Sequence, residues 1–294
     1  MLVLTLCYRI IGFVREMLVA SYLGTSAEAD AYSIAYSVPT VVVEMLALGA
    51  IGSASIAVFQ SVLQKDGKQR LNQLYSRVMA AILLALAALL LLCELGAPLL
   101  TKLMAPSFSG EKMALTVSMV RSMLPAILFV GVLGLQKAAL NLMGDFRSEG
   151  ISNVVFNWGM VGGVLFVARQ DRIDILIHSF IAAAFLQWLV QFRSVRRVGL
   201  RPSPDLHLRD EDLHRIFVLL IPIMFSTVVS QISPVAARAV ASTCEDGAVA
   251  MLNYAYKVTM LPIGVFGGAI ATASFPRISR YDNESRSEEH TSEL

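Results

Sequence analysis

The chain has 294 residues, of which 56% are hydrophobic and only 16% are charged, and its formal net charge is +2. Soluble domains carry about a quarter of their residues as charged side chains, so this composition excludes an ordinary water-soluble domain. It predicts an all-α, polytopic membrane protein, because backbone that faces lipid must satisfy its own hydrogen bonds.

Eight apolar segments predict about eight transmembrane helices. We expect them near residues 2–23, 31–61, 78–104, 113–141, 151–168, 173–192, 213–242 and 248–276. The second segment is too long for a straight crossing, and Pro39, Gly49 and Gly52 are places where it could bend or break. Later segments have possible bends at Pro125, Pro222, Pro234 and Pro262.

The first predicted helix carries charges inside its apolar run. At about 100° per residue, Arg9, Gly12, Arg15 and Glu16 fall on one face. A guanidinium at the bilayer centre costs roughly 2.5 to 3.5 kcal/mol, so such groups usually face a bundle interior or a water-filled cavity. We expect this face to point at something polar. The alternative is that the arginines snorkel to the headgroup layer.

Acidic residues follow in the second segment. Asp30 opens it, where the carboxylate either caps the helix N-terminus or has a functional role. Glu44 lies on nearly the same helix face, about 21 Å deeper. We expect Glu44 to pair with a basic residue across the bundle.

The last two segments add basic residues at membrane depth. Arg238 lies in the seventh segment. In the eighth, Asn253, Tyr254 and Lys257 share a face, and Lys257 either lines a cavity or snorkels outward from a helix end.

Charge in the loops predicts the orientation. Basic residues concentrate after the second, fourth, sixth and eighth segments, which places these loops and the N-terminus in the cytoplasm. The longest polar stretch is rich in arginine. Beside a membrane it predicts topology determination and contact with anionic lipid rather than nucleic-acid binding.

These segments divide the chain into parts. We expect an N-terminal lobe of six helices over residues 1–192, a cytoplasmic basic linker over 193–212, and the first two helices of a truncated C-terminal lobe over 213–285. Residues 286–294 change abruptly in composition and match the translation of a sequencing adapter. We therefore expect them to be a non-native tail on a fragment.

The sequence carries no signal for catalysis. His178, His207 and His214 lack metal-ligand spacing, and the three cysteines are isolated. Glycine-rich phosphate loops are also missing. We therefore expect no enzyme activity, no cofactor and no bound metal.

Two blocks of residues resemble the lipid II flippase (MurJ/MviN) family. The first comprises Arg9-Ile-Ile-Gly-Phe-Val-Arg-Glu16, Ala29-Asp30-Ala31-Tyr32, Pro39 and Gly49-Ala50. The second comprises Ser230-Gln-Ile-Ser233, Arg238-Ala-Val-Ala-Ser242, Leu252-Asn-Tyr-Ala255 and Leu261-Pro-Ile-Gly264. The resemblance covers roughly the N-terminal half of a family member.

The resemblance implies a transporter of the multidrug/oligosaccharidyl-lipid/polysaccharide (MOP) exporter superfamily, with a two-lobed MATE-like fold and alternating access. It further implies that the protein moves lipid II, an undecaprenyl-diphosphate-linked peptidoglycan precursor, outward across the bacterial inner membrane for cell wall biogenesis. Arginine and lysine suit such a cargo, because they donate charge-assisted hydrogen bonds to phosphate. Substrate binding would fall to Arg9, Arg15, Lys257 and, as a secondary candidate, Arg238. Gating or charge balance would fall to Asp30, Glu44 and Glu16.

Several positions depart from the family pattern. Val43 and Glu44 stand where well-known members carry paired arginines, and Leu48, Ala237 and Tyr256 stand where acids are found. The headgroup cavity is thus less basic than in those members. This leaves open a flippase for another undecaprenyl-diphosphate-linked polysaccharide. One rival is a cation-coupled multidrug exporter of the same superfamily, in which acids would dominate the cavity, and Arg9 and Arg15 weigh against it. A rival of another class is a membrane scaffold that transports nothing and needs its buried charges only as packing pairs.

Overall fold

The computed structural model describes residues 2–45, 48–170, 172–203, 205, 207 and 209–263. These residues form ten helices and no strand, which confirms the all-α expectation. In chain order the helices are α1 (Leu2–Leu23), α2 (Ala27–Met45), α3 (Leu48–Met104), α4 (Gly110–Met123), α5 (Ala126–Val130), α6 (Leu133–Leu142), α7 (Arg147–Gln170), α8 (Asp174–Arg197), α9 (Glu211–Ala241) and α10 (Ala248–Pro262).

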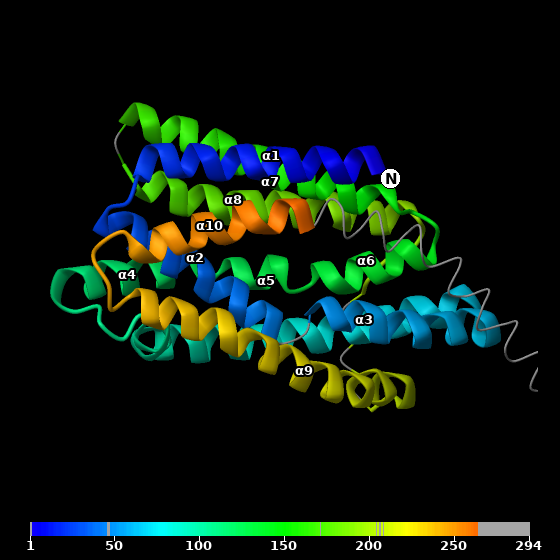
Figure 1. Cartoon of the computed structure of the whole chain (residues 1–294). Coiled ribbons are helices and arrows are strands. Elements are labelled where there is room, and N and C mark those ends of the chain that lie inside the picture. Colours follow the sequence, from blue (N-terminus) through cyan, green and yellow to red (C-terminus); the bar gives the residue numbers. More distant parts are fainter. Residues whose placement is uncertain are drawn as a thin grey trace, which may run out of the picture. The chain divides into compact units, whose positions relative to one another are not determined.

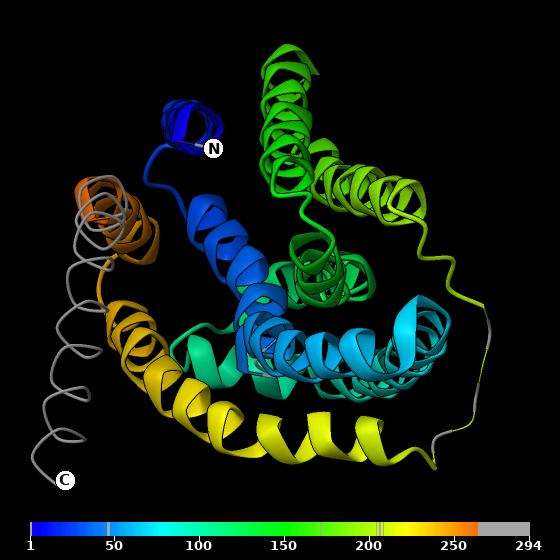
Figure 2. The ribbon, with the colours of Figure 1, turned by 90° about the vertical axis from the view of Figure 1, so that its right-hand side faces the viewer.

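The chain divides into a first unit of residues 1–253 and a second unit of residues 254–294. In the first unit the long helices run side by side (Figure 1). α7 packs on α1 and α8, while α3 packs on α6 and α9. The end-on view in Figure 2 shows α9 beside α3, with α7 and α8 on the opposite side of the unit. The described part of the second unit is the end of α10 and the residue that follows it.

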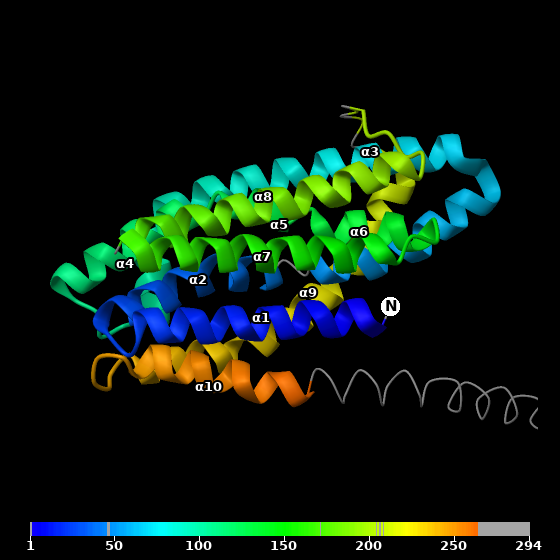
Figure 3. The same ribbon diagram turned by 90° about the horizontal axis from the view of Figure 1, so that it is seen from above.

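Four of the described helical segments are long and apolar enough to cross a membrane: Ile51–Met104, Arg147–Ala168, Asp174–Arg197 and Glu211–Ala241. A fifth is added if α4 and the α5–α6 segment, which meet at a bend of 40°, count as one span. Figure 3 shows α4, α5 and α6 following one another across the unit. The chain is therefore a multi-pass membrane protein. The count of eight spans stays a prediction, and the predicted eighth segment runs beyond the described residues.

Pro39, a possible break in the long second segment, lies inside α2. Residues 46–47, between α2 and α3, lie outside the described residues. The polar stretch 62–77, expected as a loop, is helical within α3 except at Gly67, whose φ of 78° and ψ of −176° interrupt the helix. Glycine tolerates this left-handed backbone, so the chain reverses without a loop of several residues.

Glycines let the helices approach closely. A Cβ on Gly52 of α3 would lie 3.0 Å from the carbonyl oxygen of Gly134 on α6. A Cβ on Gly159 of α7 would lie 3.0 Å from the Cβ of Ala183 on α8. Small residues at such crossings are the usual means by which membrane helices pack. These contacts fix the helices that carry the polar groups described below.

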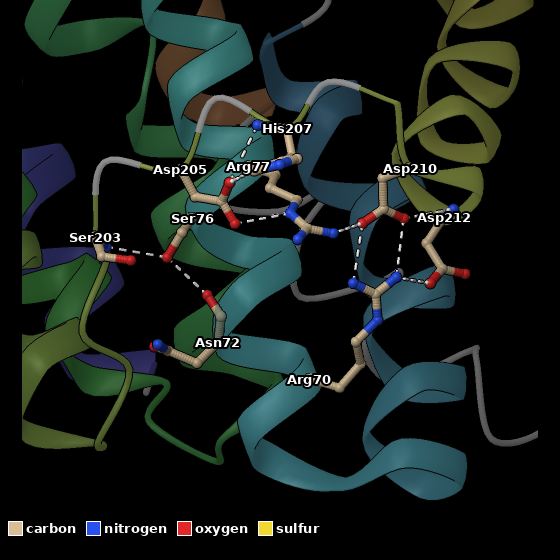
Figure 4. Close-up of polar contacts among 9 residues, drawn as sticks. All are labelled: Arg70, Asn72, Ser76, Arg77, Ser203, Asp205, His207, Asp210 and Asp212. Atoms are coloured by element: carbon tan, nitrogen blue, oxygen red, sulfur yellow. Dashed lines mark hydrogen bonds and ion pairs between the residues drawn. The ribbon is translucent and has the colours of Figure 1, made fainter.

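The segment between α8 and α9 is bound to α3 (Figure 4). Asn72 Nδ2 donates to the carbonyl oxygen of Arg201 at 3.1 Å, and Asn72 Oδ1 accepts from the backbone N–H of Arg201 at 2.6 Å. One turn further along α3, Ser76 Oγ accepts from the backbone N–H of Ser203 at 3.1 Å. Side chains of α3 thus satisfy backbone groups that would otherwise need water.

Five charged side chains, here called the linker clasp, complete this attachment: Arg70, Arg77, Asp205, Asp210 and Asp212. Arg70 donates to both carboxylate oxygens of Asp210 at 2.9 and 3.0 Å, and to Asp212 at 3.0 Å. Arg77 donates to Asp205 at 2.8 Å and also to Asp210. The Asp210 side chain is only 1% exposed, and it also caps α9 by accepting from the backbone N–H of Asp212.

Asp205 and Asp210 of this segment pair with arginines of α3, whereas the arginines of the segment and of the adjoining helix ends are exposed. The exposed arginines are Arg193, Arg196, Arg197, Arg201, Arg209 and Arg215. Hydrogen bonds from the backbone of His207 and from Arg77 lower the pKa of Asp205 to about 2. Burial opposes the charge of Asp210, but hydrogen bonds from Arg70 and Arg77 outweigh it and lower its pKa. Asp205 and Asp210 are therefore ionised at neutral pH. Contact of the arginines with anionic lipid stays a prediction.

Candidate functional site

Arg15 lies inside the first unit, between α1, α2 and α7. Its guanidinium pairs with Glu16, and its Cζ lies 5.8 Å from the ring centroid of Tyr36 and 5.7 Å from that of Phe156. Only 8% of the residue is exposed. The carboxylate and the electron-rich faces of the two rings stabilise the buried positive charge. Arg15 is therefore buried in the bundle and does not snorkel to a headgroup layer.

Arg9 lies on the same face of α1, less than two turns before Arg15, and is half-buried. Its Nε is buried and has no hydrogen-bond partner among the described residues. Between the two arginines, a Cβ on Gly12 would lie 3.2 Å from Asn157 Oδ1, so α1 approaches α7 closely here. The buried Nε of Arg9 therefore keeps donor capacity that could bind an anion.

Asp30 does not cap its own helix. Ser26 does so, since its Oγ accepts from the backbone N–H of Ala29 at 3.1 Å. The Asp30 carboxylate instead accepts from the backbone N–H groups of Gly247 and Ala250, each at 2.8 Å, and so caps α10 from a distance of more than 200 residues in sequence. The Asp30 side chain is 2% exposed.

Lys112 completes what we call the Asp30 cluster, namely Asp30, Lys112 and Asp246. Lys112 Nζ donates to Asp30 Oδ2 at 2.8 Å and to Asp246 Oδ1 at 2.7 Å. Nearby, Ser107 donates to the carbonyl oxygen of Ser242 at the end of α9, and the two Oγ atoms are 3.1 Å apart. The turn between α9 and α10 is therefore tied to α2, α4 and the segment that precedes α4.

Two further polar contacts join α9 to α2 and to α10. Glu44 accepts a hydrogen bond from Gln231 of α9 at 2.7 Å, and Arg238 attracts the same carboxylate. Arg238 Nε donates to Asn253 Oδ1 of α10 at 3.3 Å. Glu44 was expected to pair with a basic residue across the bundle. Its direct contact is instead the amide of Gln231, and Arg238 acts on it through its charge.

An apolar cavity of about 370 Å³ lies beside the Glu44–Gln231 contact. Residues of α2, α3 and α9 line it, among them Val38, Met45, Leu103 and Gln231. It offers volume for hydrocarbon but almost no polar group for a charged headgroup.

Lys257 lies in the second unit and is half-buried. Arg9 and Arg15 belong to the first unit, so the geometry of that unit does not include Lys257. The substrate-binding role of Lys257 stays a prediction. No cluster of three His, Cys, Asp or Glu side chains that could hold a metal ion occurs in the described ranges.

The structure brings together some predicted residues and adds others. Arg15 meets Glu16, Asp30 meets the N-terminus of α10, and Glu44 meets α9. Sequence reasoning missed four partners: Lys112, Asp246, Gln231 and Asn253. In the sequence, Lys112 is only a basic residue in a loop. Its separation from Asp30 by 82 positions leaves no local pattern that could have joined the two.

Comparison with known proteins gives a consistent result. A family model described as lipid II flippase MurJ matches residues 19–294. The chain is similar to the lipid II flippase MurJ of Burkholderia cenocepacia, with 27% identity over 99% of this chain and 58% of the relative. It is also similar to a probable lipid II flippase MurJ of Rhizobium tropici, with 29% identity over 94% of this chain and 53% of the relative. The chain thus spans little more than half the length of these curated relatives.

Two solved structures share the fold. A lipid II flippase MurJ in an inward closed conformation gives a TM-score of 0.80 at 24% identity, over 95% of this chain and 58% of that one. An inward-facing MATE-family multidrug resistance transporter of the MOP superfamily gives 0.71 at 14% identity, over 94% of this chain and 66% of that one. These similarities confirm the expected MATE-like fold.

Proposed function

Because the chain belongs to the lipid II flippase MurJ family, we propose that it forms the N-terminal part of a flippase for lipid II. The cargo is an undecaprenyl-diphosphate-linked peptidoglycan precursor, and the transport supports cell wall biogenesis. The protein would act in the bacterial inner membrane by alternating access between two helical lobes. The task is transport rather than covalent chemistry. The family match over residues 19–294 carries this proposal.

The proposed orientation has the N-terminus in the cytoplasm. It places the linker clasp and the exposed arginines on the cytoplasmic side, as the distribution of positive charge requires. It places the Asp30 cluster on the outer side. This cluster joins the α9–α10 turn to α2 and α4. These three parts follow the seventh, first and third predicted segments, and the same charge rule assigns the loops after those segments to the outer side.

The proposed state of the first unit is closed at its outer end. Asp30 supports this, because its carboxylate bonds α2 to the N-terminus of α10, and such a bond must break if the two separate on that side. Ser107 and Ser242 make a second contact at the same end. A flippase that binds its cargo from the cytoplasm needs its outer end shut at that stage.

The proposed binding group is cationic. Arg9 would donate to the diphosphate, since its buried Nε has no partner in the described part of the chain. Arg15, which is paired with Glu16, would also hold the diphosphate. Lys257 and, as a secondary candidate, Arg238 would contribute from the helices after the linker. Proposed charge balance falls to three acids: Glu16, Asp30 and Glu44.

Complementation tests the proposal. The full-length gene would be recovered and expressed in cells depleted of their own lipid II flippase, with membrane insertion checked by immunoblotting. Rescue is expected from the unchanged protein and from Arg193→Ala, which removes an exposed cytoplasmic arginine. Rescue should be lost in Arg9→Ala. An inserted protein that fails to rescue would contradict lipid II as cargo and would favour another undecaprenyl-diphosphate-linked glycan.

A further inference from the structure

Lys112 lies where three parts of the first unit meet. Its Nζ is 2.8 Å from Asp30 Oδ2 on α2 and 2.7 Å from Asp246 Oδ1 in the turn between α9 and α10. The same Nζ lies 4.2 Å from the ring centroid of Phe108, a position that favours a cation. One ammonium group on α4 thus bridges α2 and the α9–α10 turn.

The two ion pairs of Lys112 connect α4 to different parts of the first unit. α4 packs along α2, so the pair with Asp30 joins two neighbouring helices of the N-terminal region. Asp246 belongs to the turn that leads into α10, and its side chain is 69% exposed, against 2% for Asp30. Of these two pairs, only the one with Asp246 holds the α9–α10 turn to α4.

Opening at this end would separate the α9–α10 turn from α2 and α4. The pair between Lys112 and Asp246 would break, whereas Lys112 would stay with Asp30 because both belong to packed neighbours. Without the lysine, two carboxylates would face the same gap, and like charges repel. The lysine therefore favours the closed arrangement through one bond that opening must break.

We propose that Lys112 is a latch at the outer end, a positioning residue that sets the balance between closed and open arrangements through its pair with Asp246. This inference rests on the proposed function, because only a transporter that opens at this end needs a latch there. The pair is partly exposed, so its contribution is modest: an exposed ion pair changes such an equilibrium by roughly two- to fivefold.

The test measures how often the outer end opens. A single cysteine replaces Ser242, which is 7% exposed, in full-length protein whose native cysteines are changed to alanine. A membrane-impermeant maleimide added outside labels this position only when the α9–α10 turn has moved. The labelling rate tracks the open fraction and needs no substrate, so the result does not depend on whether lipid II is the cargo.

Lys112→Met and Asp246→Asn should each raise the labelling rate roughly two- to fivefold. The double variant should label no faster than either single variant, because both remove one bond. High salt should raise the rate of the reference protein toward that of the variants. Lys112→Arg, which keeps the charge, and Lys102→Met, which removes an exposed lysine near the same end, should label at the reference rate.

Labelling of Lys112→Met at the reference rate would overturn the proposal. So would a double variant whose rate rises by the product of the two single effects, since the residues would then act separately. If Lys112→Met fails to insert, Asp246→Asn carries the same prediction, because this residue is exposed and its loss leaves Asp30 paired with Lys112.

Discussion

Removal of the charge on Asp210 should release the segment between α8 and α9 from α3. In Asp210→Asn, the clasp loses the carboxylate that accepts from Arg70 through both oxygens and from Arg77. Hydrogen bonds to charged groups contribute about 1.5 to 3 kcal/mol each. The two arginine side chains are 28% and 19% exposed and regain water, so we expect a net loss of about 2 to 4 kcal/mol in the local closing free energy.

Backbone hydrogen exchange of the full-length protein measures this loss. The backbone N–H groups of Arg201 and Ser203 are bonded to Asn72 and Ser76 of α3, so their exchange requires local release from α3. When opening is fast, the exchange rate follows the open population, so the rate should rise roughly 30- to 900-fold. Asp212→Asn is the matched control. It removes one bond from a side chain that is 29% exposed and should raise the rate less than about tenfold. Equal rates for the two variants would refute the reasoning.

The same contacts lead to three further predictions. Gly247→Ala should destabilise the closed outer end by at least about 1 to 2 kcal/mol, because φ is +92° and the new Cβ would lie 2.3 Å from the carbonyl oxygen of Thr25. Thermal unfolding measures this loss. Gly144→Ala is its control, because Gly144 has a φ of +81° but open space around it, so this variant shows the backbone cost alone. Asp30→Asn should increase outer-end labelling by about tenfold, because the amide cannot accept both backbone N–H groups and the lysine as a carboxylate does; an unchanged rate would exclude Asp30 from the gate. The pKa of Asp205 is lowered to about 2, so the clasp should be complete above about pH 4 and weaken as the pH falls toward 2; hydrogen exchange in the α8–α9 segment would show this, and weakening at pH 6 would contradict it.

The membrane class and the all-α architecture could be predicted because hydrophobicity is a property of the sequence itself. Prolines and glycines could be recognised as sites of bending, but their exact use could not. Gly67 interrupts a helix where a loop was expected, since a polar stretch does not reveal whether one residue or ten will make the turn. Pro39 stays within α2.

The partners of charged residues were harder to foresee. Asp30 left a choice between capping and function, and the structure combines the two, because the helix that it caps is α10. In the sequence, Asp205 and Asp210 are only acids in a basic linker. In the structure they accept hydrogen bonds from arginines of α3 that lie more than 120 positions earlier. Such pairs depend on tertiary packing, so periodicity along the chain carries no trace of them. Lys257 retains its predicted role only through family resemblance.

The most direct test of the central claim is transport of lipid II by the purified full-length protein in vesicles. Lipid II would be supplied on one side, and a membrane-impermeant enzyme that cleaves its headgroup would report arrival on the other. We predict rapid arrival with the unchanged protein and arrival at the protein-free rate with Arg9→Gln. Transport that is equally fast in Arg9→Gln, or no transport by the intact protein, would contradict a lipid II flippase whose cargo is held by Arg9.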